Sequence, residues 1–219
     1  MSASALELPL FPLNVVLFPG VVLPLHVFEP RYRQMIIDCQ AEQRAFGIVL
    51  AQPDSLPLQE IPCSVGTMVE IRDLQRLEDG RFVLMAMGLE RFRILSHHRQ
   101  KPYLSGLVEI YHDVPTSGNE LDLYFRYAYE LFSTYLELLL KAANEENRDI
   151  RSSLPDSPED LSYFIAYFLE IQDERKQHFL ELTSTLQRLR EEISILRREV
   201  PLMRQILAKP PDDDHSRLN

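Results

Sequence analysis

The chain has 219 residues, of which 45% are hydrophobic and 26% are charged, as is typical of folded globular proteins and not of disordered ones. Its formal net charge is −10 at pH 7, so the protein as a whole repels nucleic-acid phosphates, and nucleic acid is not an expected partner. The longest apolar run, residues 15–25, is broken by Pro19, Gly20 and Pro24, so neither a membrane span nor a membrane partner is predicted.

The cysteines and the first residues bear on the compartment. Cys39 and Cys63 are too few for a disulfide framework, and neither lies in the Cys-x-x-Cys spacing of a structural zinc site. Residues 1–4 carry no basic stretch leading into an apolar run, so no secretory signal is expected. These features predict a cytoplasmic protein.

The opening of the chain is punctuated by prolines at positions 9, 12, 19, 24 and 30. Because proline fixes φ and removes an amide donor, we expect an extended segment that wraps around a barrel rather than a central strand. Pro30 can begin a helix, where a missing N–H costs nothing. Apolar residues then recur at helical spacing at Tyr32, Met35, Ile36 and Cys39.

Short strands are predicted from there to residue 110. Residues 46–51 form an apolar run between turn formers, and residues 69–72 alternate apolar and charged side chains. Asp79-Gly80 supplies the positive φ angles of a tight hairpin between 74–77 and 82–85. Residues 91–95 and 103–110 continue the pattern, so several strands with a single helix indicate a small barrel.

The second half is predicted to be helical. All seven glycines lie in the first 118 residues, which places a boundary near residues 116–118. A long helix is predicted over 121–143, another after the Ser157-Pro158 cap, a short one over 176–182, and a final helix after Thr183 or Ser184. The predicted domains are 1–117 (barrel lobe), 118–209 (helical lobe) and 210–219 (disordered tail).

Two interpretations of the final helix stay open. Leucines and other apolar residues continue at spacings of three and four from Phe179 to Leu207, as in a coiled-coil seam that would allow self-association. An ordinary bundle helix is favoured, because Thr183-Ser184-Thr185 and Pro201 interrupt the pattern.

An ordered set of motifs runs through the chain. It comprises LPLFPL at 8–13, VLFPG at 16–20, LPLHVFEPRY at 23–32, FGIVL at 46–50, VGT at 65–67, DGR at 79–81 and GLERFRI at 88–94. Together with the helical stretch at 165–189, this set resembles the amino-terminal, polypeptide-binding domain of the Lon protease family over roughly residues 6–200. The resemblance implies an α+β fold: a PUA-like β-barrel lobe with one helix, followed by a helical bundle lobe that ends in a long helix.

Most of the motif residues are expected to be structural. They are Pro19, Gly20, Pro24, Glu29, Pro30, Arg31, Gly47, Gly66, Asp79, Gly80, Arg91 and Phe92. In particular, Glu29 and Arg31 flank Pro30 and are expected to form charge-assisted hydrogen bonds that fix the turn from strand to helix.

The resemblance implies a non-enzymatic module that binds unfolded or exposed apolar polypeptide segments, alone or beside a partner protease or chaperone. The residues expected to contact a polypeptide are Leu23, Leu25, Phe28, Tyr32 and Met35, on a proline-stiffened segment that leads into a helix. The competing interpretation is that these side chains belong to the core.

No catalytic residue, metal site or cofactor is predicted. No glycine precedes a lysine, so the phosphate-binding P-loop of an ATPase is absent, and the chain ends before a Lon-type Ser–Lys protease domain could fit. The six histidines lack metal-binding spacing. Two alternatives stay open: an unrecognised hydrolase or peptidase-associated activity, and a nucleic-acid-binding PUA-like protein, for which the interleaved Arg91, Phe92 and Arg93 are the nearest support.

Overall fold

The computed structural model of the protein describes residues 5–53, 55, 59–145 and 154–208. The chain divides into two compact units: unit 1 contains residues up to Pro115 together with Ser162–Thr185, and unit 2 contains Thr116–Leu161 and the residues from Leu186 onward. The domain limits at 117/118 and 209/210 stay a prediction, and the tail 210–219 lies outside the described residues.

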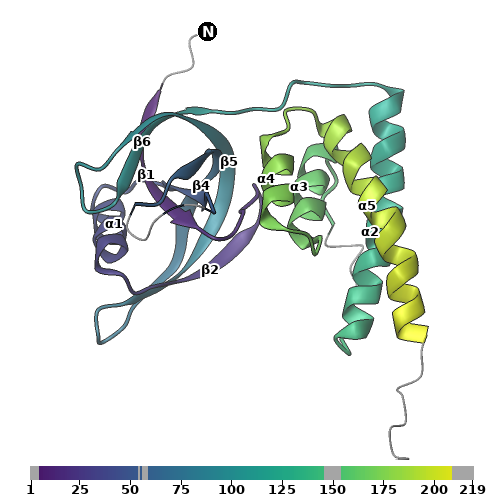
Figure 1. The fold of residues 1–219 in the computed structure, drawn as a ribbon, viewed down its shortest axis with the longest axis horizontal. Coiled ribbons are helices and arrows are strands. Elements are labelled where there is room, and N and C mark those ends of the chain that lie inside the picture. Colours follow the sequence, from purple (N-terminus) through teal and green to yellow (C-terminus); the bar gives the residue numbers. More distant parts are fainter. Residues whose placement is uncertain (1–4, 54, 56–58, 146–153, 209–219) are drawn as a thin grey trace, which may run out of the picture. The chain divides into compact units, whose positions relative to one another are not determined.

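The strands of unit 1 form a single mixed sheet (Figure 1). They are β1 (Leu6–Leu13), β2 (Val22–Val27), β3 (Phe46–Ala51), β4 (Pro62–Arg76), β5 (Phe82–His98) and β6 (Leu104–Ile110). Their order is β2-β5-β4-β3-β1-β6, and β5 also pairs with β6, so five strands close into a barrel. The long β5 allows this, because its first half pairs with β2 and its second half with β6. The α+β fold class is thereby confirmed.

The position of β1 corrects one expectation. The proline-rich opening was predicted to avoid a central position, yet β1 lies between β3 and β6. The physical reason is a staggered register: β6 pairs with residues 6–10 and β3 with residues 10–13. Pro9 and Pro12 therefore each have a partner strand on one side only, and the missing amide of each can face the unpaired side.

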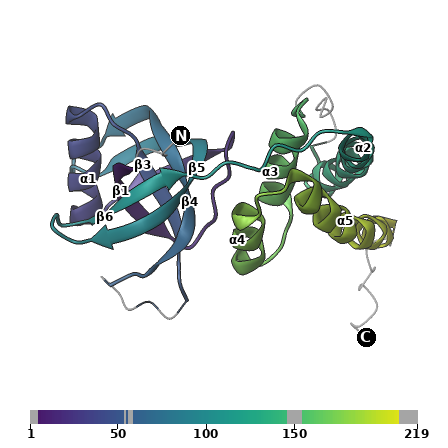
Figure 2. The same cartoon turned by 90° about the horizontal axis from the view of Figure 1, so that it is seen from above.

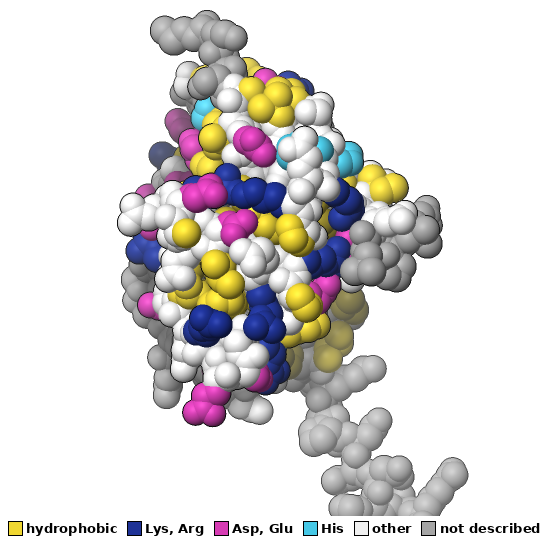
Figure 3. All heavy atoms as spheres, turned by 90° about the vertical axis from the view of Figure 1, so that its left-hand side faces the viewer, with side chains coloured by type: hydrophobic (Ala, Val, Ile, Leu, Met, Phe, Trp, Pro, Cys, Tyr) yellow, Lys and Arg dark blue, Asp and Glu magenta, His cyan; other side chains and the backbone are white. Residues whose placement is uncertain are grey.

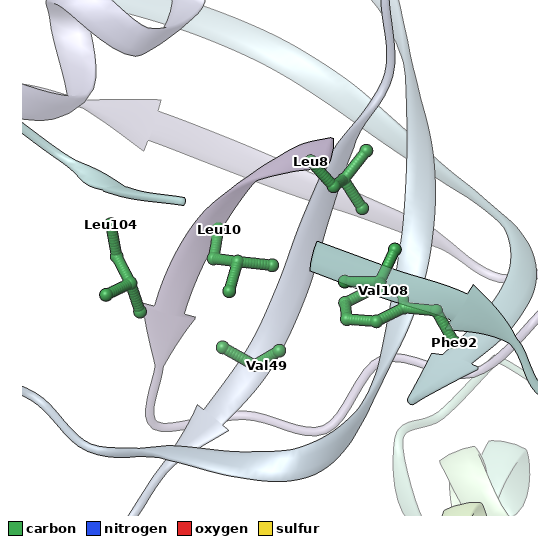
Figure 4. Close-up of a cluster of buried hydrophobic side chains, with 6 residues drawn as sticks. All are labelled: Leu8, Leu10, Val49, Phe92, Leu104 and Val108. Atoms are coloured by element: carbon green, nitrogen blue, oxygen red, sulfur yellow. The ribbon is translucent and has the colours of Figure 1, made fainter. Parts of the chain in front are cut away.

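The barrel interior is filled by a cluster of buried side chains around Phe92. Figure 4 shows these six residues converging from the four strands β1, β3, β5 and β6: Leu8, Leu10, Val49, Phe92, Leu104 and Val108. Two glycines make room for the Phe92 ring: a Cβ on Gly47 would lie 2.5 Å from Phe92 Cζ, and one on Gly66 would lie 2.8 Å from the same atom. Glycine is thus required at both positions by close packing rather than by a turn.

Helix α1 (Pro30–Ala41) begins at the predicted proline and lies beside the barrel in Figures 1 and 2. It buries Tyr32, Met35, Ile36 and Cys39, the four residues that recur at helical spacing. The Tyr32 ring packs 4.1 Å from that of Phe11 on β1, which anchors the helix to the barrel wall.

The remaining helices are α2 (Asn119–Ala142), α3 (Pro158–Phe168), α4 (Asp173–Glu181) and α5 (Thr185–Ala208). The Ser157 hydroxyl accepts a hydrogen bond from the Asp160 amide at 3.1 Å, which is the predicted cap of α3. The last helix, α5, continues through Pro201 and ends at Ala208. No described helix is long and apolar enough to span a membrane.

In unit 2, α2 and α5 run side by side in the same direction (Figures 1 and 2). Arg190 forms an ion pair with Glu120. About two helical turns further along both helices, Arg197 donates a hydrogen bond to the Tyr127 hydroxyl at 2.8 Å. On α5, Arg188 and Glu192 are both buried one turn apart. Burial raises the pKa of Glu192 well above its ordinary value, and the Arg188 charge opposes that rise.

A buried arginine ties α4 to the barrel within unit 1. Arg91, on β5, is 3% exposed, and its guanidinium donates to the carbonyl oxygens of Leu180 at 2.6 Å and Leu182 at 2.7 Å. It also pairs with Asp113, whose other carboxylate oxygen accepts from the Thr185 hydroxyl at 2.6 Å. The last carbonyls of a helix have no partner inside the helix, so the arginine satisfies groups that would otherwise be buried unpaired.

Replacing Gly66 with alanine is expected to destabilise unit 1 by about 1–3 kcal/mol, the usual cost of overpacking a core. The new Cβ would lie 2.5 Å from the Ile48 carbonyl oxygen, a backbone atom that cannot move without breaking the β3–β4 pairing. Urea unfolding measures the change, and Ser64→Ala, at an exposed position on the same strand, is the control. Equal midpoints for the two variants would contradict this account.

Replacing Arg91 with alanine is expected to cost about 3–5 kcal/mol, because Asp113 would stay buried without its cation and two carbonyls would lose their donor. Arg93, the next residue on that side of the chain, is half exposed and pairs with Glu109. Arg93→Ala should therefore leave the urea midpoint nearly unchanged. A similarly small effect of Arg91→Ala would show that α4 is held by other contacts.

Candidate functional site

An exposed apolar strip follows the first half of β5 and its partner β2. Residues directly opposite each other in an antiparallel pair point to the same side of the sheet. Three such pairs point outward and define what we call the β2/β5 face: Val22 with Met87, Pro24 with Met85, and His26 with Val83. Val22 is 44% exposed, Met85 39% and Val83 38%, although all three are hydrophobic.

The intervening pairs point into the barrel. They are Leu23 with Ala86, Leu25 with Leu84, and Val27 with Phe82. Ala86, Leu84, Val27 and Phe82 are buried, whereas Leu23 and Leu25 are half-buried. The two strands are thus apolar on both sides, although only one side contributes to the core.

The β2/β5 face has a polar border on one side. The neighbouring strand β4 places Glu70 opposite Met87, Arg72 opposite Met85 and Gln75 opposite Val83. Arg72 and Glu70 form an ion pair at 2.9 Å, so these charges compensate each other. An apolar strip with a polar rim is the usual organisation of a protein-binding surface.

Phe28 extends this strip beyond the end of β2. Its side chain is 60% exposed, and its ring centroid lies 5.9 Å from that of His26. The turn after it is fixed by Arg31, which donates to Glu29 at 3.0 Å and to Glu60 at 2.9 Å. The expected bond between Glu29 and Arg31 is therefore present, with Glu60 as a partner that the sequence did not indicate.

The pairing with Arg31 has electrostatic consequences. The hydrogen bonds from Arg31 lower the pKa of Glu60, against the opposing effect of partial burial. The Arg31 guanidinium also lies 4.4 Å from the centre of the Tyr32 ring, which is itself buried against the barrel. Burial raises the pKa of the Tyr32 hydroxyl. This cluster stabilises the β2–α1 turn that directly follows Phe28.

Other motif residues shape the ends of the two strands. Gly20 has a φ of +76°, its amide donates to the Gly88 carbonyl at 3.0 Å, and the Gly88 amide donates to the Val21 carbonyl at 2.8 Å. Pro19 precedes this junction, which sets the register of β2 on β5. At the other end Gly80 has a φ of +80°, as expected for the Asp79-Gly80 turn.

The structure separates the five predicted contact residues. Phe28 is well exposed, Leu23 and Leu25 point inward, and Tyr32 and Met35 are 3% and 0% exposed. Polypeptide contact by these residues stays a prediction, and the two on α1 are covered by the fold. Sequence reasoning missed the exposed, outward-pointing residues Val22, Pro24, His26, Val83 and Met85, and the half-buried Met87. The signal for them was the unbroken apolar run 82–87 in a strand that packs on one side only.

Figure 3 shows a different distribution of side chains on another face of the molecule. There, hydrophobic side chains lie in small patches between Lys or Arg and Asp or Glu side chains. Scattered apolar groups of this kind are ordinary on protein surfaces. The β2/β5 face differs because its outward-pointing residues, all apolar except His26, are neighbours along two paired strands.

The described residues give little support to metal or nucleic-acid chemistry. Within the described ranges, no group of three or more His, Cys, Asp or Glu side chains could hold a metal ion. Arg91 and Phe92 are buried and Arg93 pairs with Glu109, so these three residues do not form an exposed basic and aromatic patch.

Replacing Glu60 with glutamine removes the ion pair with Arg31 and is expected to cost about 1 kcal/mol at neutral pH. The folded-state pKa of Glu60 lies below its ordinary value of 4.5, so its contribution is complete above that pH and is lost as the pH falls through the lower folded-state value. Thermal unfolding between about pH 7 and pH 3 should show the two proteins converging in the acid range. Glu90→Gln is the exposed control, and a constant difference at all pH values would exclude the ion pair as its cause.

Comparison with known proteins places this geometry in a family. Residues 7–198 match the model of the ATP-dependent protease La (LON) substrate-binding domain. Over 205 residues, the chain is 29% identical to a Lon protease of Syntrophus aciditrophicus, with 90% of this chain and 25% of that protein covered. Lon protease 2 of Myxococcus xanthus is 26% identical over 201 residues. The chain thus spans about a quarter of the length of these relatives.

Solved structures agree with the fold. A Lon N-terminal domain protein from Xanthomonas campestris is 27% identical, with a TM-score of 0.65 over 86% of this chain and 98% of that one. The N-terminal domain of the Mycobacterium avium complex Lon protease has a TM-score of 0.67 at 20% identity, over 87% of this chain and 98% of that one. From the family match and these likenesses, the chain belongs to the LON substrate-binding domain family.

Proposed function

We propose that this protein is a non-enzymatic binding module that holds extended, apolar segments of other polypeptides on the β2/β5 face. The observation that carries the proposal is the row of three outward-pointing cross-strand pairs, Val22–Met87, Pro24–Met85 and His26–Val83. The family supports the general class, since its defining domain is described as substrate-binding in an ATP-dependent protease.

The face suits an unspecific apolar client for two reasons. Its backbone is already fixed by pairing of β5 with both β2 and β4, so little conformational entropy is lost when a client binds. Met85 and Met87 have flexible, polarisable side chains that adapt to different partners. The compensated Glu70–Arg72 pair on the rim adds no net charge that would select one sign of client.

We further propose that the protein acts in the cytoplasm, alone or beside a protease or chaperone that processes the bound client. The matched region is the substrate-binding domain, which in the Lon relatives makes up about a quarter of the chain. Cys39 and Cys63 are both free thiols, as is usual in a reducing compartment.

Replacing Met85 with serine is expected to weaken capture of an unfolded polypeptide by about fivefold, the effect of losing roughly 1 kcal/mol at an interface. Fluorescence anisotropy with a labelled, reduced and carboxymethylated protein that stays unfolded measures the affinity. Because Met85 is 39% exposed, the melting temperature should change little.

The matched control is Leu107→Ser, since Leu107 is 40% exposed on β6, away from the β2/β5 face. It should lose similar stability and retain the affinity of the unmodified protein. Equal affinities of the Met85 and Leu107 variants would place the client elsewhere on the protein.

A further inference from the structure

A cavity of about 350 Å³ lies in unit 1, at the other end of β5 from the β2/β5 face. Its walls are formed by Gln52, Pro62–Ser64 at the start of β4, Ile94–His97 near the end of β5, and Glu181 at the end of α4. It shares no residue with the β2/β5 face, so what it binds is a separate question.

The cavity is lined by both apolar and polar residues. Its apolar lining residues are Pro62, Ile94 and Leu95: Pro62 is buried, Ile94 also packs against the barrel core, and Leu95 is 50% exposed although it is large and apolar. Ser64 and Ser96 add hydroxyl groups that can accept or donate hydrogen bonds. A long side chain with an alkyl stem and a polar head has this same division of character.

The electrostatic field in the cavity is negative. Among the described residues that line it, Glu181 is the one carboxylate and His97 the one imidazole, and no lysine or arginine is present. Burial is the main cause that raises the pKa of Cys63, and the nearby carboxylates of Glu181 and Glu174 add to it. A cationic head group is therefore attracted, and a phosphate or carboxylate is repelled.

The Glu181 carboxylate is held in place from the preceding turn of α4. Gln177, which is 5% exposed, donates from Nε2 to the Val65 carbonyl at 3.0 Å and to Glu181 Oε1 at 2.8 Å. Both partners are acceptors, so the orientation of this amide is determined by its surroundings. A carboxylate offers about four lone-pair positions, so one bond from Gln177 leaves acceptors for a ligand.

We propose that this cavity binds a primary ammonium or guanidinium group on an apolar stem, as in a lysine or arginine side chain or a free alkylamine. The head group pairs with Glu181 and hydrogen-bonds the Ser64 hydroxyl, and the stem lies on Ile94 and Leu95. The site is independent of the proposed capture of apolar segments and is tested without an unfolded client.

The test uses nuclear magnetic resonance of the full-length, ¹⁵N-labelled protein titrated with hexylamine, with hexan-1-ol, and with acetyl-Gly-Lys-Gly-amide. Binding in the cavity shifts the backbone amides of Cys63, Ser64, Leu95 and Ser96 with hexylamine and not with the neutral alcohol. Glu181→Gln, which keeps an acceptor for Gln177, should weaken hexylamine by about threefold to fivefold, as expected for a partly exposed ion pair. Glu78→Gln, an exposed carboxylate on the β4–β5 hairpin, is the control and should leave the affinity unchanged.

The comparison of hexylamine with the lysine peptide shows whether the ligand is a free alkylamine or a peptide side chain. Shifts with both amines support the shared chemistry, and shifts with one alone assign the site to a free alkylamine or to a peptide side chain. The proposal is overturned if hexylamine and hexan-1-ol cause equal shifts, or if the Glu181 and Glu78 variants bind hexylamine with equal affinity. It is also overturned if hexylamine causes no shift at concentrations on the order of 10 mM.

Discussion

The buried guanidinium of Arg91 is the interaction on which the arrangement of unit 1 depends. It satisfies two carbonyls at the end of α4 and the carboxylate of Asp113 from a single position on β5. A lysine could not replace it, because the planar fork of arginine offers five donors at fixed angles whereas an ammonium acts as a point charge. Segments about ninety residues apart in the chain, β5 and the end of α4, are thereby joined. The position of Glu181, and with it the negative field of the cavity beside Cys63, follows from this junction.

The fold was predictable where local sequence and tertiary packing agree. The α1 helix begins at the expected proline and buries the four residues that recur at helical spacing. The strand at residues 46–51 and the Asp79-Gly80 turn also lie where they were expected. The central place of β1 could not be inferred, because it depends on a register in which two partner strands overlap at Leu10 alone. The apolar pattern of the last helix, followed in the sequence to Leu207, agrees with α5, which continues through Pro201 to Ala208.

The candidate surface was harder to predict than the fold. Sequence reasoning placed three of its candidates on or next to β2, which carries part of the proposed surface; Phe28 among them is exposed, whereas the other choices face the barrel or lie in the core. A shift of the register by one residue moves every side chain of a strand to the other face of the sheet. The sequence around β2 does not show which of its alternate residues point outward until its partner strand is known. Pairing with β5 determines which residues point outward: Val22 lies opposite Met87, and every second residue from there points to the same side. The roles of Arg91 and Glu181 depend on contacts between distant segments, for which no local pattern exists.

The free side of β2 carries a consequence for the behaviour of the protein in concentrated solution. Among the described strands β2 pairs with β5 alone, so the backbone groups on its other side have no strand partner there and lie next to an apolar surface. Exposed edges of this kind recruit other strands and lead to aggregation. Here the edge has only six residues, and Pro24 at its centre offers no amide hydrogen. A second β2 strand could therefore not add in a continuous ladder, so an apolar surface can stay open to solvent while growth of an extended sheet between molecules is blocked.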